Sequence, residues 1–208
     1  TSRRQRQMCI RDSQSMVANA QADGFILLYS KKDCPVAAYL RSEGLLHVIV
    51  GKAAQSANQT IYIDNDNALA GEEAADYLYE MGHRRIAYLS GDSNLDYSQG
   101  RVSAFRSFAK RRKLESINIE FTNFDAEQAA MLTLEMLRSP KPPTAFIYET
   151  EILAAASLHA MAEAYTTGQL KTGEGQSAGY PNGLPAIVSF EDLSLIHISE
   201  PTRPISIS

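Results

Sequence analysis

The sequence predicts an α/β fold in which helices cover parallel strands. Short, nearly continuous apolar runs alternate along the chain with segments whose apolar residues recur every three or four positions. Runs of the first kind are typical of strands buried on both faces, and the second pattern is that of an amphipathic helix. Regular alternation of the two predicts parallel strands joined by right-handed crossovers.

Six short runs are the predicted strands. Each is four to eight residues long, as expected for strands of a buried parallel sheet. In chain order they are Gly24–Ser30, Leu46–Gly51, Ile86–Ser90, Ile117–Phe121, Thr144–Tyr148 and Pro185–Phe190.

Four helices are predicted between these strands. The first follows Asp66 or Asn67 as its N-cap and ends with Gly82 at the C′ position. The others span Ser98–Lys113, Ala126–Arg138 and Glu149–Tyr165. The basic run 110–113 complements a helix dipole in our interpretation, with a nucleic-acid patch as the alternative. Residues 166–183 are rich in Gly, Thr and Ser and predict a long loop.

Length and composition exclude several classes of protein. The chain has 208 residues, a formal charge of −4 and 44% hydrophobic residues, which is the range of ordinary globular domains. No apolar run approaches the ~18 residues that a membrane-spanning helix needs. Mild acidity argues against a surface that binds nucleic acid throughout. Two cysteines cannot build a disulfide scaffold.

The two ends of the chain are predicted to be foreign to the fold. Residues 8–13 can be encoded by ATGTGTATAAGAGACAG, and the reverse complement of this DNA encodes Leu193–His197. One element in opposite orientations, similar to the mosaic end of a transposase-based sequencing adapter, therefore accounts for both ends. We expect residues 1–13 and 193–208 to be adapter-derived and leave them out of the interpretation of the fold.

The sequence carries no motif of a catalytic or metal centre. Cys-x-x-Cys, His-Glu-x-x-His, the P-loop and Gly-x-Ser-x-Gly are all absent. The run 64–67 departs from a calcium loop, because Leu69 stands where that loop has glycine. His83 has no nucleophile signature beside it and is interpreted as a structural turn residue. We therefore expect no enzyme activity, no cofactor and no metal.

Two stretches together resemble a known family. The first runs from Ile63-Asp64-Asn65-Asp66-Asn67 to Gly82-His83-Arg84-Arg85-Ile86, and the second is Arg101-Val102-Ser103-Ala104-Phe105. They resemble the effector-binding core of lactose-repressor-family (LacI/GalR) transcriptional regulators, and the Asp-Asn-Asp-Asn variant is most similar to the maltose-operon repressor branch. The resemblance spans residues 14–192.

The resemblance implies a periplasmic-binding-protein-like fold of two Rossmann-like lobes with parallel sheets. Residues 14–64 would form an incomplete first lobe and residues 65–192 the second. A small effector, expected to be a sugar of the maltose type, would bind in the cleft between the lobes. The family's helix-turn-helix, which binds operator DNA, is not among these residues. A cytoplasmic homodimer with no membrane association is implied for the whole protein.

The resemblance also implies a set of effector-binding residues. Arg101 matches the family's effector-contacting arginine, whose planar fork can hold two oxygens. Phe124 follows a strand where the family has its stacking aromatic, although a core position is the alternative. Glu191 stands where the family has aspartate, and a carboxylate there can accept hydrogen bonds from two hydroxyls.

Three further positions complete the predicted site. Thr150 lies before a predicted helix, where its hydroxyl can cap the helix or bond to a ligand. Lys52 follows the second predicted strand at the cleft edge. Tyr29 ends the first predicted strand and is a candidate for the opposite wall.

Two other functions remain open on the sequence. A sugar-binding protein of an uptake system shares this fold without binding DNA. An α/β enzyme of unrelated chemistry is the third possibility.

Overall fold

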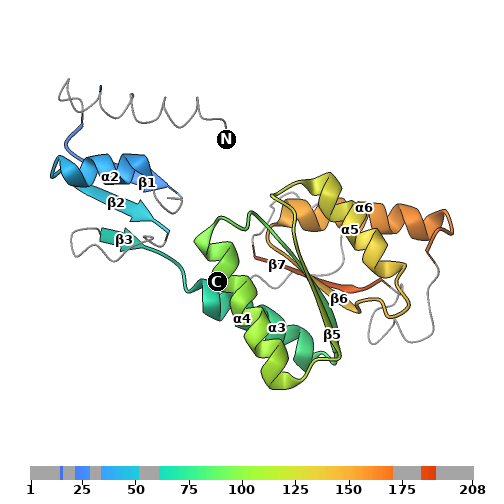
Figure 1. The fold of residues 1–208 in the computed structure, drawn as a ribbon. Helices are drawn as coiled ribbons and strands as arrows, with labels where there is room; N and C mark the ends of the chain where they lie inside the picture. Colours follow the sequence, from blue (N-terminus) through green and yellow to red (C-terminus); the bar gives the residue numbers. More distant parts are fainter. Residues whose placement is uncertain (1–14, 16–21, 29–33, 52–60, 171–183, 191–208) are drawn as a thin grey trace. The chain divides into compact units, whose positions relative to one another are not determined.

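The computed structural model describes residue 15 and residues 22–28, 34–51, 61–170 and 184–190. These residues form two compact units (Figure 1). Unit 1 consists of residues up to Asp66 together with Asn94–Tyr97, and unit 2 holds the other residues. The division at 66/67 falls two residues after the boundary expected from the sequence. The predicted adapter-derived ends lie outside the described residues.

Unit 1 contains a three-stranded parallel sheet. Strands β1 (Phe25–Leu28), β2 (His47–Val50) and β3 (Ile61–Ile63) are hydrogen-bonded in the order β1-β2-β3. Helix α2 (Pro35–Ser42) connects the first two strands. Strands β1 and β2 were predicted from the sequence, whereas β3 was not, because its three residues are too few to show a periodicity. Helix α2, which has eight residues and begins with proline at its first turn, was not predicted either.

Unit 2 is built on a four-stranded parallel sheet of order β5-β4-β6-β7. All four strands were predicted. Helix α3 precedes the first strand, and helices α4, α5 and α6 lie in the three connections between successive strands. The bounds are α3 Asn67–Glu80, β4 Arg85–Ser90, α4 Asp96–Arg112, β5 Ser116–Phe121, α5 Ala126–Leu137, β6 Ala145–Tyr148, α6 Glu151–Thr166 and β7 Ala186–Ser189.

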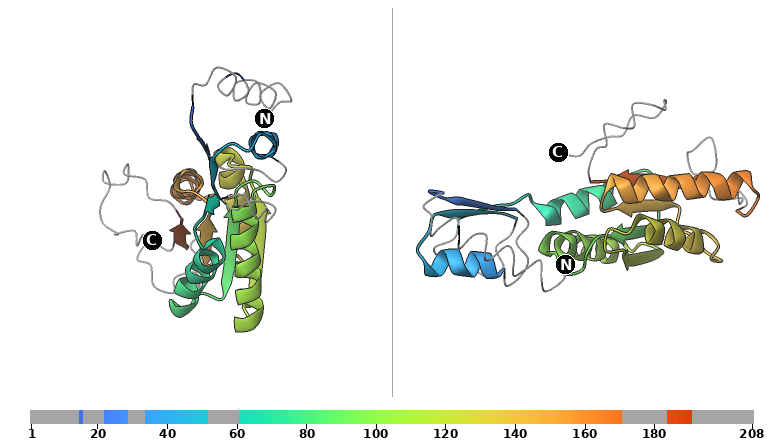
Figure 2. Two further views of the ribbon diagram at one scale, coloured as in Figure 1. Left: turned by 90° about the vertical axis from the view of Figure 1, so that its left-hand side faces the viewer. Right: turned by 90° about the horizontal axis from the view of Figure 1, so that it is seen from above.

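Two helical layers sandwich the unit 2 sheet (Figures 1 and 2). Helices α3 and α4 pack on one face through Leu78, Phe105 and Phe108, which meet alternate residues of β4 and β6. Helices α5 and α6 pack on the other face, α5 through Met136 and Leu137 and α6 through Leu153 and Met161. Strands β4 and β6 lie in the middle of the sheet and are buried on both faces, as their continuous apolar sequences predicted.

Two sequence interpretations are confirmed at the end of α3. Gly82 has a φ of +94°, the left-handed conformation expected at a C′ position. His83 is buried behind it, and its Nδ1 lies 3.0 Å from the Thr144 hydroxyl. Burial, reinforced by the neighbouring Arg84, lowers the pKa of His83, so its ring is a neutral packing residue at the amino end of the sheet.

No helix within the described ranges is long and apolar enough to cross a bilayer.

Candidate functional site

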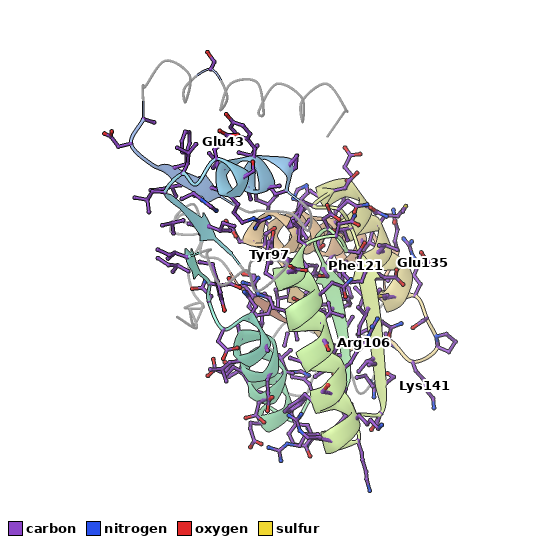
Figure 3. All side chains as sticks on the ribbon, turned by 60° about the vertical axis from the view of Figure 1, so that its left-hand side comes forward. Glu43, Tyr97, Arg106, Phe121, Glu135 and Lys141 are labelled. Atoms are coloured by element: carbon purple, nitrogen blue, oxygen red, sulfur yellow. The ribbon has the colours of Figure 1, made fainter. Side chains whose placement is uncertain are left out.

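The carboxyl end of the unit 2 sheet gathers the polar and aromatic side chains of interest. Because all four strands are parallel, the segments that follow them leave the sheet at the same edge. Phe121 ends β5 at this edge, whereas Lys141 lies in the connection to the amino end of β6, and Figure 3 shows these two residues far apart. Open parallel sheets bind ligands at the carboxyl edge.

A buried carboxylate, Glu149, is the centre of this edge. It directly follows β6 and is 1% exposed. The Tyr88 hydroxyl donates to its Oε2 at 2.8 Å, and the Ser90 hydroxyl donates to the same oxygen at 2.9 Å. Arg101 Nη1 donates to the other oxygen, Oε1, at 2.8 Å. Both oxygens are thus hydrogen-bonded, as a buried carboxylate requires.

Arg101 is held on several sides. Besides its ion pair with Glu149, its Nε donates to Asn67 Oδ1 at 3.1 Å. Its guanidinium lies 4.3 Å from the centre of the Phe190 ring, a cation–π contact. The Arg101 side chain is 13% exposed. A guanidinium restrained in this way presents its donors in one fixed orientation.

The backbone around Arg101 is positioned by a close approach of two helices. A Cβ added to Gly71 in α3 would lie 2.5 Å from the carbonyl oxygen of Arg101 in α4. Only glycine fits there without movement of one helix. Gly71 therefore sets the spacing that allows Asn67, one turn earlier, to reach the Arg101 side chain.

Tyr88 remains a hydrogen-bond donor to Glu149 at any physiological pH. Burial and the adjacent carboxylate raise the pKa of its hydroxyl well above the usual value of 10, so the proton stays on the phenol. Its ring packs edge-on against Phe105 and also contacts Phe190, with ring centres 5.8 and 6.0 Å apart respectively. The hydroxyl that holds Glu149 is consequently anchored in the core.

Phe124 lies at the same edge, in the turn after β5, in an uncommon backbone conformation. Its φ is +62° and that of Asn123 is +51°, so two successive non-glycine residues are left-handed. Its ring packs against the backbone after β4, where a Cβ on Gly91 would come within 2.2 Å of the ring. The residue is 37% exposed, which excludes a core position. The Phe124 ring thus packs against Gly91, and part of Phe124 is exposed to solvent.

Thr150 is the N-cap of α6, but its side chain makes no capping hydrogen bond. The predicted start of this helix at Glu149 was wrong, since the helix begins at Glu151. The difference matters because Glu149, outside the helix, turns into the sheet edge toward Arg101. Thr150 follows Glu149 directly, and its hydroxyl does not cap the helix.

Contacts link three of the six predicted site residues to one edge. Phe124 packs on Gly91, the residue that follows Ser90. Ser90 and Arg101 both donate hydrogen bonds to the Glu149 carboxylate. Thr150 directly follows Glu149 in the sequence. The other three, Tyr29, Lys52 and Glu191, lie outside the described residues.

Sequence reasoning missed Glu149, Ser90 and Tyr88 as members of the site. A signal for Glu149 was present, because a lone carboxylate directly after a buried apolar strand needs a cationic partner. The polar atoms of Ser90 and Tyr88 gave no signal, since both residues occupy positions in an apolar strand.

The arrangement provides groups that can bind a polar ligand. It offers a partly exposed aromatic surface, a fixed guanidinium and a threonine hydroxyl, which are groups that bind sugar rings and their hydroxyls. No cluster of three or more His, Cys, Asp or Glu side chains that could hold a metal occurs among the described residues.

Comparison with known proteins finds relatives of this chain among transcriptional regulators. Residues 75–167 match the periplasmic binding protein-like domain model. The HTH-type transcriptional regulator MalR of Staphylococcus xylosus is 34% identical over 90 residues, which are 43% of this chain and 26% of that protein. The chain therefore spans about a quarter of the length of this relative.

Solved structures extend the similarity to most of the chain. A putative transcriptional regulator LacI from Bacillus cereus subsp. cytotoxis has a TM-score of 0.74 and 27% identity, and covers 89% of this chain and 62% of its own. The transcriptional regulator CelR–cellobiose complex has a TM-score of 0.75 at 23% identity, with coverages of 96% and 57%. Residues 75–167 thus match a periplasmic-binding-protein-like domain, and the chain is similar over most of its length to LacI-family regulators.

Proposed function

We propose that the chain is the ligand-sensing part of a sugar-responsive transcriptional repressor. Its effector is a sugar, with the maltose type as the first candidate. Phe124 stacks on a sugar ring, while Arg101 and Thr150 bond to hydroxyls. Lys52, Tyr29 and Glu191 complete the site in this proposal.

The observation that carries the proposal is the fixed Arg101 guanidinium at the same sheet edge as the exposed ring of Phe124. Two left-handed residues hold that ring in place, at a cost of roughly 1–2 kcal/mol each. Strained backbone of this kind is concentrated at ligand-binding positions. The chemistry of a flat apolar surface beside fixed donors supports a sugar as the ligand.

The similar proteins support the same assignment. A regulator solved with cellobiose has the fold of this chain, and the curated relative is an HTH-type transcriptional regulator. We infer from these that the whole protein binds operator DNA, acts in the cytoplasm as a homodimer and is a sensor rather than an enzyme. Effector binding would change operator affinity through its different affinities for two conformations of the protein.

Calorimetric titration tests the site directly. The complete gene product that contains these residues is titrated with maltose, cellobiose and other common sugars. Arg101→Ala and Phe124→Ala should each weaken the binding of the active sugar at least about tenfold, the equivalent of 1.4 kcal/mol.

Arg106→Ala is the matched control, because Arg106 is exposed on the same helix, as Figure 3 shows. It should bind sugar like the wild type. Absence of heat with every sugar, or equal affinity of the Arg101→Ala variant, would contradict the site.

A further inference from the structure

The turn that carries Phe124 is fixed to the end of strand β4 by hydrogen bonds. Thr122 N–H donates to the Ser90 carbonyl oxygen at 2.9 Å, and the Thr122 hydroxyl donates to the same oxygen at 3.0 Å. Asn123 N–H donates to the Gly91 carbonyl oxygen at 3.1 Å. The backbone that leads into Phe124 is therefore held in place by the neighbouring strand.

The other end of the turn is fixed at the start of helix α5. Asp125 is the N-cap of this helix, and its side chain accepts a hydrogen bond from Gln128 N–H at 3.0 Å. The Asp125 N–H donates to the Thr122 carbonyl oxygen at 2.8 Å. The two left-handed residues of the turn thus lie between anchored positions, and the Phe124 side chain is the part of the turn that can move.

Gly91 leaves the space that the far end of the Phe124 ring occupies. A Cβ on Gly91 would lie 2.2, 2.4 and 2.9 Å from Cζ, Cε1 and Cε2 of the ring. Carbon atoms in favourable non-bonded contact are about 3.5–4.0 Å apart, so the ring and a Cβ cannot both be accommodated. The φ of Gly91 does not lie in the left-handed region, and alanine could adopt this backbone conformation. The ring, and not the conformation of the chain, therefore requires glycine at position 91.

We propose that Gly91 is a positioning residue that holds the Phe124 ring in the orientation in which it stacks on a sugar. This inference rests on the proposed function, in which Phe124 contacts the effector. A ring that is held in place before the ligand arrives loses little side-chain entropy on binding, which raises the affinity. A side chain at position 91 would displace the ring while the hydrogen bonds on both sides of the turn persist.

Gly91→Ala tests this role because it moves the ring without removing it. The affinity of the complete gene product for its sugar should fall about tenfold, as in Phe124→Ala. The midpoint of urea unfolding should change little, because the displaced ring can turn toward solvent and alanine lowers the conformational entropy of the unfolded chain. Calorimetric titration and urea unfolding measure the two quantities.

A double-mutant cycle shows whether Gly91→Ala acts through the ring. In the Phe124→Ala background the added methyl group has no ring to displace, so Gly91→Ala should cause no further loss of affinity. Additive losses would overturn the proposal, because the methyl group would then act on another part of the site. Gly100→Ala is the matched control, since its Cβ would lie 3.7 Å from the nearest atom, and this variant should bind sugar like the wild type.

NMR provides a readout that needs no sugar. In protein with ¹³C-labelled phenylalanine, the ring protons of wild-type Phe124 should show nuclear Overhauser contacts to the Hα protons of Gly91. In Gly91→Ala the chemical shifts of these ring protons should change. The amide protons of Thr122 and Asp125 should stay protected from exchange, because their hydrogen bonds persist.

The outcomes distinguish this proposal from the proposed function. Unchanged Phe124 ring signals or wild-type affinity in Gly91→Ala would overturn the role of Gly91, even if Phe124→Ala loses its sugar. If the wild type binds no sugar but its ring signals depend on residue 91, the proposed function fails and the fixing of the ring by Gly91 stands. If Gly91→Ala does not fold, Gly91→Ala/Phe124→Ala should fold, and its failure to fold would show that the methyl group conflicts with something other than the ring.

Discussion

The two parallel sheets of this protein differ in how fully helices cover them. In unit 2, β4 and β6 are buried along both faces, with helices on each side. In unit 1, residues of β1 alternate between half-buried and exposed, and β3 is exposed throughout. Within the described residues, α2 lies on one side of that sheet (Figure 2). The two parallel sheets thus differ in how much of their surface is buried.

The difference shows which part of the described chain has a complete core. On one face of the unit 1 sheet, Ile26, Leu28, Ile61 and Ile63 are all more than half exposed. The equivalent positions of unit 2 are in contact with aromatic and aliphatic side chains of four helices. Unit 2 should therefore unfold as a cooperative body whose stability does not depend on those exposed residues.

The largest predicted effect compares the same residue type in the two sheets. Ile86 in β4 is 0% exposed and Ile26 in β1 is 73% exposed. Ile86→Ala should destabilise the protein by about 2–5 kcal/mol because it leaves a cavity in the core. Ile26→Ala should change the free energy of unfolding by less than about 0.5 kcal/mol. Urea unfolding followed by circular dichroism measures both, and similar losses would mean that the two faces are equally covered.

A second comparison tests the spacing of the α3–α4 layer. Gly71→Ala should cost about 1–3 kcal/mol, since the added methyl group meets the Arg101 backbone. Gly100→Ala adds the same group where the nearest atom is 3.7 Å away, and should stabilise α4 by roughly 0.5–1 kcal/mol.

Thermal melts of the two variants should therefore move in opposite directions from the wild type. Gly71→Ala should also weaken sugar binding, because the shift displaces Arg101. A rise in melting temperature in both variants would refute the close approach of the helices.

A third, smaller effect concerns the ends of helices. Helix α2 of unit 1 and α3 of unit 2 are followed by left-handed glycines, Gly44 and Gly82, whereas α4 is followed by Lys113 with a φ of +53°. The three turns share one hydrogen bond, from a backbone N–H to the carbonyl oxygen five residues earlier. After α4 this bond runs from Leu114 N–H to the Ala109 carbonyl oxygen at 3.0 Å. Lys113→Gly should stabilise unit 2 by about 1 kcal/mol through relief of this conformation. Chemical unfolding would detect it, and a loss of stability would show that the Lys113 side chain makes a stabilising contact.

The smallest expected effect is a pH dependence confined to unit 2. The pKa of His83 is lowered in the folded state, so the unfolded chain binds its proton more readily. The contribution of His83 to stability should be complete above its unfolded pKa of about 6.5 and decline as the pH falls toward its folded pKa.

Unfolding free energies at pH 7 and 5 check this sign. The loss between these pH values should be smaller in His83→Gln than in the wild type, with exposed His159→Gln as the control. An equal loss of unfolding free energy in all three proteins would show that His83 does not cause the pH dependence.

Much of unit 2 could be predicted because its strands have continuous apolar sequences and its helices have clear ends. The sequence patterns gave all four strands and all four helices, with small errors at their bounds. Unit 1 was harder, since α2 is short and β3 has only three residues. Short elements are stabilised by tertiary contacts and leave little periodicity in the sequence.

The candidate site could be predicted only in part. Arg101, Phe124 and Thr150 were assigned from a family resemblance, which names positions but does not say which contacts hold their side chains. Glu149 was assigned to a helix, and its burial depends on the pairing of β6 with β4. The contact of Phe124 with Gly91 depends on a left-handed turn that nothing in the local sequence requires.

The most direct test of the account compares the two ends of the unit 2 sheet by hydrogen–deuterium exchange with and without the bound sugar. We expect added protection in the segments after β4, β5 and β6, around Gly91, Phe124 and Thr150. We expect no change at the amino end, around His83 and in residues 138–144. Protection confined to the amino end, or unchanged exchange at the carboxyl end under saturating sugar, would contradict it.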